Sequence, residues 1–527
     1  MRADTRSKLL AIVALSLVTP AALPAAESEV AIVSPPPESF FEIVRERDRE
    51  PAREFYAKYA SAGGLPVVAA EEVADEALTR TVEIVEHMLA GRPDVLQKMV
   101  ENQMYLIIIG KNQVYTDMPE NRHVRNKEYM NERVRGTGGK PTSFGEENLL
   151  CLALDRYDDE SIAVHEFCHT IDGTLRSLDS EWRDRVRSVY RSVLDQGKYQ
   201  GAYAGSNPGE YWAEIAQSYF DCNRVNNWNH GPVGTREDLR AYDPEGYQLV
   251  HTTFNLTPEN DWRYTYLQKH PVVIDPPEKF DINPYYTKFS WAREFTVLGR
   301  QAPDAALLKA NDTIRKLFAY RHDILKALIT DDVRLVVLGA GETLSDLPEW
   351  PLLEQAGLLP DARQAKYSPD AKLVVVPAEQ VAVDPASLDA SGNPVIALMM
   401  DAAYQITASR PVDPDWENRG RDVQQYELNV ERLDERFGKK VSETRSAAVA
   451  DGKWSGTPAA GSDADYFIAG VLAYFDAGGA ALTPTGARQP ILDRAALRDY
   501  DPGLYELVHE TMAYEGRQDW KFQAGQQ

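Results

Sequence analysis

Cysteine is scarce in this chain of 527 residues, which contains only three. Three thiols cannot build a disulfide framework for a protein of this size, so the fold must depend on hydrophobic cores. At about 150 residues per domain, the length allows two to four domains. Because three is an odd number, at most one bond can form within the chain. Cys151 and Cys222 are the pair that could form it, and Cys168 is expected to be a small packed residue.

Basic residues are also in deficit, with 57 Lys and Arg against 81 Asp and Glu, for a formal net charge of -24. A field of this sign repels phosphate backbones and anionic lipid headgroups, so we expect no nucleic-acid partner. Beyond the N-terminus, no apolar run is long enough to span a bilayer. The composition, 43% hydrophobic and 26% charged, is typical of a water-soluble globular protein.

The N-terminus has the pattern of a secretory signal. Three basic residues precede or begin an apolar run over Leu9–Val18, and small residues suited to cleavage follow. The apolar run is short for a bilayer-spanning helix, although an uncleaved anchor is the alternative. We therefore predict a signal peptide at residues 1–26, a secreted or periplasmic protein, and no stable membrane insertion after cleavage.

The chain repeats itself. Leu239–His251 (LRAYDPEGYQLVH) matches Leu497–His509 (LRDYDPGLYELVH), and Leu106–Glu120 matches Leu335–Glu349 in the same order and at nearly the same offset. Such matches indicate a tandem duplication. The prolines that cluster near 271–284 mark a break between the copies.

The domain organisation follows from this duplication. We predict a linker at 27–50, a first copy at 51–270, a second linker at 271–284 and a second copy at 285–527. Within the first copy, apolar spacing and turn signals predict helices within 71–102, at 160–174 and at 208–221, and strands at 105–109 and 148–154. Helices and short strands without regular alternation predict an α+β domain, mostly helical with a small sheet.

The first copy contains the sequence His165-Glu166-Phe167-Cys168-His169. On a helix, histidines four residues apart project from one face and can bind one ion. Glu166 can reach a metal-bound water as the general base, so the motif predicts one Zn²⁺ ion in this copy. A helix without metal is the alternative, but its apolar neighbours would leave two buried imidazoles in need of partners.

The third ligand is expected downstream. The metzincin pattern would need a glycine and a histidine where the chain has Asp172 and Leu175, so that class is excluded. Asn207 can cap a helix on which Glu210 and Glu214 share a face. One of these carboxylates can bind the metal while the other accepts a hydrogen bond from a ligating imidazole. A surface helix with two solvated glutamates is the other interpretation.

These motifs resemble the zinc metalloprotease domain of anthrax toxin lethal factor and its secreted relatives, a gluzincin-type, zincin-like domain. The HEFCH sequence corresponds to HEFGH of that family, and Tyr203–Glu214 matches its Tyr-x-x-x-Asn-x-x-Glu-aromatic-Phe-Ala-Glu segment at most positions. The specific resemblance covers about sixty residues of the first copy. It implies that His165, His169 and Glu210 are the zinc ligands.

The resemblance also implies roles for the surrounding residues. Glu166 is the general base, and Tyr203 stabilises the oxyanion or protonates the leaving amine. Glu214 and Asp172 are expected to support the ligands rather than to bind the ion. Gly145–Leu150 could be an edge strand that pairs with an extended peptide, or a purely structural strand.

The second copy lacks the metal motif. An alignment backward from Asp476 onto Asp221 places Asp465 opposite Glu210 and Ala469 opposite Glu214. The HExxH region falls on Met400–Tyr404, which contains no histidine. We therefore expect a pseudo-enzyme module that packs on the first copy and serves packing, substrate positioning or inhibition.

The leading interpretation is a secreted zinc metalloendopeptidase that hydrolyses peptide or protein substrates with a zinc-activated water. One alternative is a non-catalytic exported binding protein in which zinc only braces the first copy. Another is a zinc hydrolase that acts on a bond other than an amide.

Overall fold

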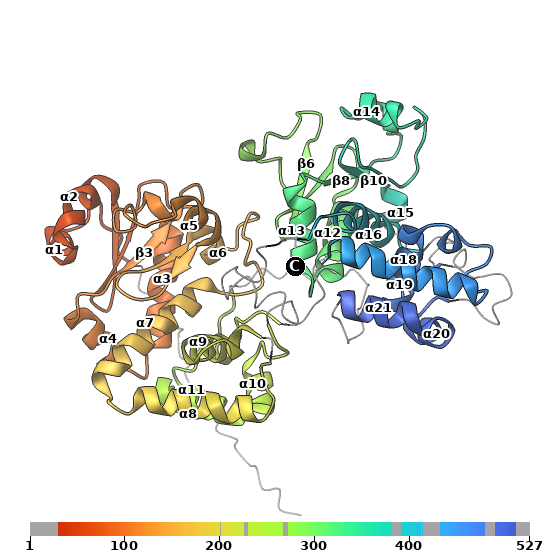
Figure 1. Ribbon diagram of the computed structural model, residues 1–527. Coiled ribbons are helices and arrows are strands. Elements are labelled where there is room, and N and C mark those ends of the chain that lie inside the picture. Colours follow the sequence, from red (N-terminus) through yellow and green to blue (C-terminus); the bar gives the residue numbers. More distant parts are fainter. Residues whose placement is uncertain are drawn as a thin grey trace, which may run out of the picture.

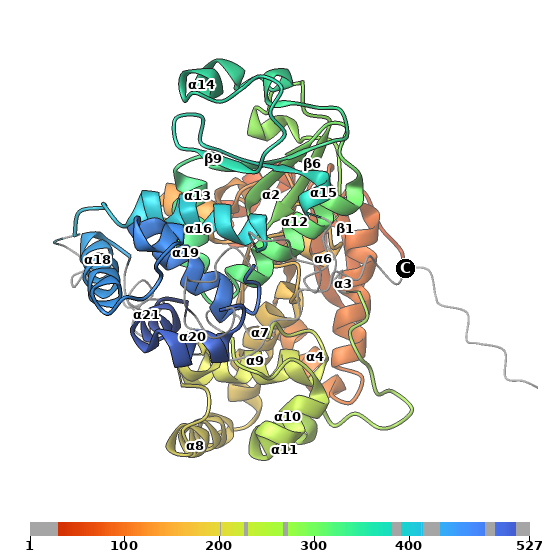
Figure 2. The same ribbon diagram turned by 90° about the vertical axis from the view of Figure 1, so that its right-hand side faces the viewer.

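The computed structural model describes residues 30–200, 202–225, 230–266, 272–381, 392–412, 414, 433–479 and 491–512, so the expected signal peptide at 1–26 lies outside the described residues. Two lobes appear in Figure 1, which we call the first half (30–266) and the second half (272–512). Seen from the side in Figure 2, the helices of the second half lie in front of the first half. Among the described helices, none combines the length and apolar character needed to cross a membrane.

The first half is an α+β unit with a five-stranded sheet of order β1-β2-β3-β5-β4. Its elements, in chain order, are α1 (Glu38–Ile43), α2 (Glu46–Phe55), β1 (Lys58–Ala62), β2 (Leu65–Ala69), α3 (Asp75–Met88), α4 (Pro93–Glu101), β3 (Leu106–Ile109), α5 (Lys127–Arg133), β4 (Gly136–Thr137), β5 (Thr142–Gly145), α6 (Glu146–Leu149), α7 (Ile162–Leu178), α8 (Trp182–Asp195), α9 (Pro208–Tyr219), α10 (Arg236–Tyr242) and α11 (Pro244–Phe254).

Strand β3 shows why the sheet is sandwiched between helices. Its four residues are all apolar and buried, and alternate side chains point to opposite faces of a strand. Leu106 and Ile108 belong to the core that includes residues of α3, α4, α7 and α9, whereas Ile107 and Ile109 pack with Phe40 of α1. The sheet therefore supports α7 on one face.

The second half has the same strand order, β6-β7-β8-β10-β9. In both halves a hairpin precedes two parallel pairings, and an antiparallel outer strand closes the sheet. This agreement favours a tandem duplication. The elements of the second half are β6 (Lys288–Ala292), β7 (Phe295–Gly299), α12 (Asp304–Leu317), α13 (His322–Thr330), β8 (Arg334–Leu338), α14 (Trp350–Gln355), β9 (Lys366–Ser368), β10 (Leu373–Pro377), α15 (Ala378–Val381), α16 (Pro394–Thr407), α18 (Glu435–Ala450), α19 (Asp463–Tyr474), α20 (Arg494–Tyr500) and α21 (Pro502–Met512).

Two expectations about local structure differ from the fold. The strand predicted at 148–154 is wrong, because α6 and a turn occupy this region. The amide of Asn148 donates to Asp155 and to the carbonyls of Tyr157 and Glu160, while its oxygen accepts from Ile162 N–H. These side-chain bonds replace a strand ladder. The edge strand considered at 145–150 is wrong for the same reason, and β4 is the outer strand instead.

The two segments expected as linkers also carry structure. Residues 38–50 include α1 and the beginning of α2, and Phe40 and Phe41 are buried against the sheet. In the segment 272–284, Ile274 pairs with Phe289 in an antiparallel bridge, as Val33 does with Tyr59 in the first half. Each half is therefore preceded by a segment that lies along its own first strand.

Candidate metal centre

Helix α7 carries the HExxH sequence. Ser161 caps the helix by accepting a hydrogen bond from Val164 N–H at 3.3 Å. The β4–β5 hairpin crosses this helix very closely, since a Cβ at Gly138 would lie 2.4 Å from Cβ of His169. Only glycine permits this approach. The outer end of the sheet therefore lies directly against α7 at Glu166 and His169.

Helix α9 supplies the third group. The Asn207 side chain caps it by accepting from the backbone N–H groups of Gly209 and Glu210 at 2.9 and 3.1 Å. Trp212 is fully buried, and its indole N–H donates to the carbonyl of Cys168 at 2.9 Å. This contact fixes α9 against α7 and places the Glu210 carboxylate opposite the imidazoles.

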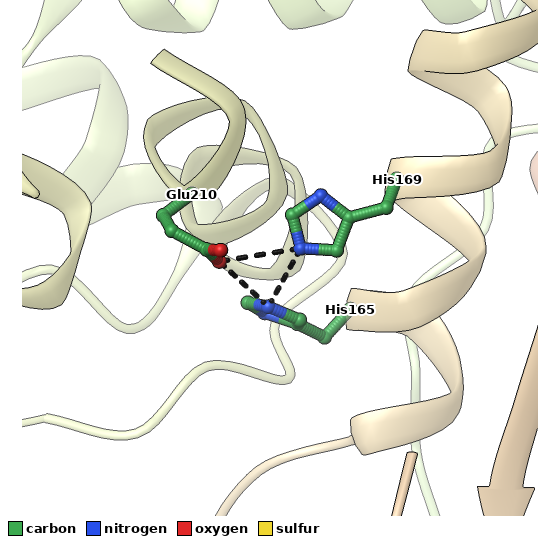
Figure 3. Close-up of side chains that lie close together, drawn as sticks. All are labelled: His165, His169 and Glu210. Atoms are coloured by element: carbon green, nitrogen blue, oxygen red, sulfur yellow. Dashed lines mark hydrogen bonds and ion pairs between the residues drawn. The ribbon is translucent and has the colours of Figure 1, made fainter. Parts of the chain in front are cut away.

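The three groups converge from two helices, as Figure 3 shows. The Nε2 atoms of His165 and His169 are 3.2 Å apart, and each is 3.2 Å from Oε2 of Glu210. Zinc bonds of about 2.0–2.1 Å in a tetrahedral arrangement place ligand atoms about 3.3 Å from one another. The described donors therefore fit three corners of a zinc tetrahedron and leave the fourth corner open.

The far side of His165 is fixed by Gln217. The amide Nε2 of Gln217 donates to the Ser161 carbonyl at 3.1 Å, so Oε1 of Gln217 faces Nδ1 of His165 at 2.7 Å. Nδ1–H of the imidazole then donates to this oxygen, which leaves the lone pair of Nε2 for a metal. Gln217 thus selects the tautomer that a ligand requires.

Negative charge surrounds the imidazoles. Burial lowers the pKa of His165, but the Glu210 carboxylate, with Glu166 and Glu214, raises it to about 10. Burial raises the pKa of Glu210, but its contacts with His165 and His169 bring it well below the ordinary value. Three carboxylates around two imidazoles favour a positive charge at this place. A divalent cation bound between the imidazoles would provide that charge at neutral pH.

The two residues expected to act in catalysis also lie at this place. Burial raises the pKa of Glu166 more than His165 and His169 lower it, so its carboxyl group holds a proton more readily than an exposed one. Tyr203 lies in a short 3-10 helix (Tyr203–Gly205) ahead of α9, and its ring is 6.1 Å from that of His165 at an interplanar angle of 28°.

The supporting residues differ in part from the expectation. Oε1 of Glu214 lies 3.6 Å from Nδ1 of His165, too far for a hydrogen bond, and Gln217 accepts the imidazole proton instead. Asp172 does not contact either histidine. Its carboxylate accepts from the Trp182 indole at 2.8 Å and pairs with Arg176, so it anchors α8 rather than a ligand.

Three buried residues near the centre, Glu160, Gln217 and His230, were not predicted from the sequence. Nε2 of His230 lies 3.7 Å from Glu160 and 3.4 Å from Glu214, and the three form a second group close enough to hold a cation. Gln217 was also missed, although it follows Glu214 by three residues on the same helix face. Helical spacing could have revealed Gln217, whereas His230 lies outside the helices and no pattern marks it.

The disulfide considered between Cys151 and Cys222 does not form in the structure. The thiol of Cys151 contacts the carbonyl of Tyr266 at 2.6 Å, and the thiol of Cys222 contacts that of Gln217 at 3.4 Å. Each sulfur therefore faces a different backbone group. Cys168 is fully buried, as expected for a packed residue.

In the second half, helices α16 and α19 follow the sheet as α7 and α9 do. Ser462 caps α19, which places Asp465 and Ala469 where α9 has Glu210 and Glu214. The caps Ser161 and Asn393 place Ala397 opposite His165 and Asp401 opposite His169, three residues earlier than the sequence alignment on Met400–Tyr404. This register brings Asp401 near Asp465. Burial raises the pKa of Asp401 against the effects of Gln405 and Lys366, and Asp465 adds a smaller increase.

The fold and site define an α+β protein with a candidate metal centre of two histidines and a glutamate. No family model and no curated protein matches the sequence. Among solved structures, the chain is similar to the PRO-PRO endopeptidase from Paenibacillus alvei at 14% identity, with a TM-score of 0.27. The match covers 36% of this chain and 96% of that protein. We infer the function from the site itself.

Proposed function

We propose that the first half is a zinc metalloendopeptidase domain that hydrolyses peptide bonds. One observation carries the proposal: Nε2 of His165, Nε2 of His169 and Oε2 of Glu210 form a triangle of 3.2 Å sides with the Glu166 carboxyl group beside it. A purely structural zinc site has four protein ligands, whereas a catalytic one keeps a position for water.

The residues around the triangle can carry out hydrolysis. A zinc ion held there supplies a Lewis acid and a water of lowered pKa. Glu166 accepts a proton from the attacking water, and its raised pKa suits it to pass that proton to the leaving amine. The phenol of Tyr203 donates a hydrogen bond to the developing oxyanion. Gln217 keeps His165 in the ligating tautomer.

The outer strand β4 offers a place for the substrate backbone. It pairs with β5 on one side and ends the sheet on the other, and Gly136 approaches Glu166 so closely that a Cβ there would lie 3.2 Å from Oε1. An extended peptide added to this edge would pass next to the general base. The substrate we propose is therefore an extended peptide or an unfolded protein segment.

The setting proposed for this activity is outside the cytoplasm. The basic and apolar pattern of residues 1–26 supports export. The acidic surface would favour neutral or basic substrates over anionic ones.

The test combines metal analysis with a cleavage profile of the chain from residue 27 onward. We expect one zinc per chain, loss of peptidase activity on chelation and its return with zinc. His169→Ala should lose both the metal and the activity. Zinc without turnover across a broad peptide library would instead support the binding-protein alternative, and a chain that binds no zinc would overturn both.

A further inference from the structure

The segment that leads into α7 is held by the second half. Asp158 forms a two-pronged ion pair with Arg315, with Oδ1 at 2.8 Å from Nη2. Asp159 pairs with Arg293 at 2.9 Å, and Arg156 pairs with Glu294 at 3.3 Å. Three ion pairs within residues 156–159 therefore join the two halves just before Ser161, the cap of the helix that carries the histidines.

Two of the three second-half residues that make these contacts, Arg293 and Glu294, occupy a backbone conformation that favours glycine. Arg293 and Glu294 form the turn between β6 and β7 with φ of 49° and 75°. The corresponding turn between β1 and β2 is Gly63-Gly64, with φ of 55° and 98°. Side chains in this conformation cost backbone energy, and such strain persists where it serves a contact or a function. The hairpin carries this strain at the two residues that reach the first half.

The contacts continue inward from Asp159 as pairs of alternating charge. Arg224 pairs with Asp159 and, at 3.3 Å, with Glu160. Burial raises the pKa of Asp159, but Arg224, Arg293 and Arg315 hold it well below the ordinary value. The exposed fraction falls from 25% for the side chain of Asp159 to 7% for Arg224 and 6% for Glu160. The chain of charges thus passes from the interface into the interior.

The last members of this chain reach the metal centre. Glu160 lies 3.7 Å from His230, and His230 lies 3.4 Å from Oε2 of Glu214. The other oxygen of Glu214 is buried, makes no hydrogen bond to the described residues and lies 3.6 Å from Nδ1 of His165. Glu214 therefore stands beside the imidazole that Gln217 orients.

We propose that the second half is a positioning domain for the metal centre. Arg293, Glu294 and Arg315 hold residues 156–160, and the ion pairs through Glu160 and His230 hold the Glu214 carboxylate beside His165, the imidazole that Gln217 orients. Buried charges are stable only with their partners, so loss of the outer pairs lets the inner ones shift. The inference rests on the proposed function, because it takes His165 as a metal ligand.

A second cation at Glu160, Glu214 and His230 is the competing interpretation of the inner group, since their ligand atoms lie within 4.8 Å of one another. Arg224 argues against it. Its guanidinium already lies 3.3 Å from Glu160, and Glu160 and Glu214 raise the pKa of His230 against the effect of burial. The guanidinium already compensates Glu160, and the contacts of His230 with both carboxylates favour its protonated form rather than a metal ion. We therefore expect one zinc per chain.

The first test replaces the strained turn by that of the first half. The double variant Arg293→Gly with Glu294→Gly removes both contacts and suits the backbone, so it should fold. We expect zinc affinity and kcat to fall about three- to tenfold, less than the 10–100-fold typical of a residue that touches a ligand. KM and the midpoint of thermal unfolding should change little. Arg334→Ala, which breaks a pair with Asp332 inside the second half, should change none of these values.

The second test uses charge reversal in the full chain. Arg315→Asp should weaken zinc binding to a similar extent, and Arg315→Lys should weaken it less. Adding Asp158→Arg to Arg315→Asp restores an ion pair of opposite sense and should restore the affinity. The absorption spectrum of the cobalt(II)-loaded protein should shift in the weakened variants and return in the restored one, because it reports ligand geometry.

The outcomes separate the two proposals. If the unaltered chain binds no zinc through His165 and His169, the proposed function fails first. If it binds zinc and cleaves peptides but the turn and charge variants keep full zinc affinity, the positioning role is overturned. Two zinc ions per chain, one of them lost in His230→Ala, would also overturn it in favour of a second metal site.

Discussion

Individual side chains decide what the metal centre can do. Three atoms from His165, His169 and Glu210 form the candidate site, and the amide of Gln217 sets which nitrogen of His165 faces it. Because the Ser161 carbonyl accepts an N–H of the Gln217 amide, the amide cannot turn over without breaking this bond and the one to His165, both of which are buried. A neutral side chain thus controls the protonation pattern of a ligand.

Gln217→Leu should therefore weaken zinc binding. The substitution removes the acceptor for Nδ1–H of His165 while filling similar space, and we expect a loss of zinc affinity of about 10–100-fold. Competition with a chromophoric chelator measures it. Gln97→Leu, on an exposed turn of α4, is the control and should leave the affinity unchanged. Full affinity in the Gln217 variant would show that the imidazole keeps its orientation without the amide.

Glu166→Gln should separate binding from catalysis. The amide keeps the size of the carboxyl group but cannot accept a proton, so kcat should fall by about 10²–10⁴-fold. Zinc content should remain near one per chain, because Glu166 is not among the three converging ligands. Metal analysis beside single-substrate kinetics checks both values. A variant that cleaves at the normal rate would remove Glu166 from the mechanism.

Elements bring these side chains together by close approach. The β4–β5 hairpin lies on α7 where Gly138 leaves no space for a side chain, and α9 is tied to α7 by the Trp212 indole. The site is thus built where three elements meet, and its geometry depends on how tightly they pack.

Alanine substitutions at two glycines, one packed against α7 and one within it, should change the free energy of unfolding in opposite directions. Gly138→Ala forces the hairpin away from His169 and should lower the free energy of unfolding by about 1–3 kcal/mol. Gly173→Ala adds a methyl group on an exposed position of α7, where nothing lies within 4 Å. It should raise the free energy of unfolding by about 0.5–1 kcal/mol. Denaturant unfolding compares them, and equal effects would contradict the close packing of the hairpin.

The convergence of His165, His169 and Glu210 could be predicted from the sequence because it depends on local structure. His165 and His169 are spaced for one helix face, and Glu210 follows a helix cap at Asn207. The turn that stands in place of the expected strand at 148–154 could not be predicted, because Asn148 satisfies backbone groups there through contacts visible only in the folded loop. Glu160 and His230 were missed for a related reason: their roles arise from tertiary placement, and neither position follows a periodic pattern.

At the scale of the whole molecule, the junction of the halves contains a histidine whose pKa is lowered, unlike those of His165 and His230. His322, at the start of α13, has a side chain that is 21% exposed and lies 3.8 Å from Glu294. Burial and nearby Arg293 lower its pKa to about 3, although Glu294 opposes this effect. Lys326 and Arg224 add to the positive field around it. The imidazole is thus neutral in the folded chain at mildly acidic pH.

The titration of His322 should therefore lower the free energy of unfolding as the pH is lowered. The unfolded chain protonates His322 near pH 6.5, whereas the folded chain resists protonation until about pH 3. Between these values the unfolded state binds more protons, so the free energy of unfolding decreases as the pH drops. His322→Gln should lose less stability than the unaltered chain between pH 7 and pH 4 in denaturant titrations. His123→Gln, at an exposed position, should follow the unaltered chain.

The sheet of the second half is assembled in the same strand order as the first, yet Ala397, Asp401 and Asp465 stand where the first half has its three candidate ligands. The second half is therefore a scaffold of the same strand order that lacks the candidate ligands and into which they could be introduced by mutation. Replacing Ala397 and Asp401 by histidine and Asp465 by glutamate would test whether this arrangement of helices is enough to bind a metal ion. Failure to bind would indicate that contacts like those made to the segment before α7 are needed as well.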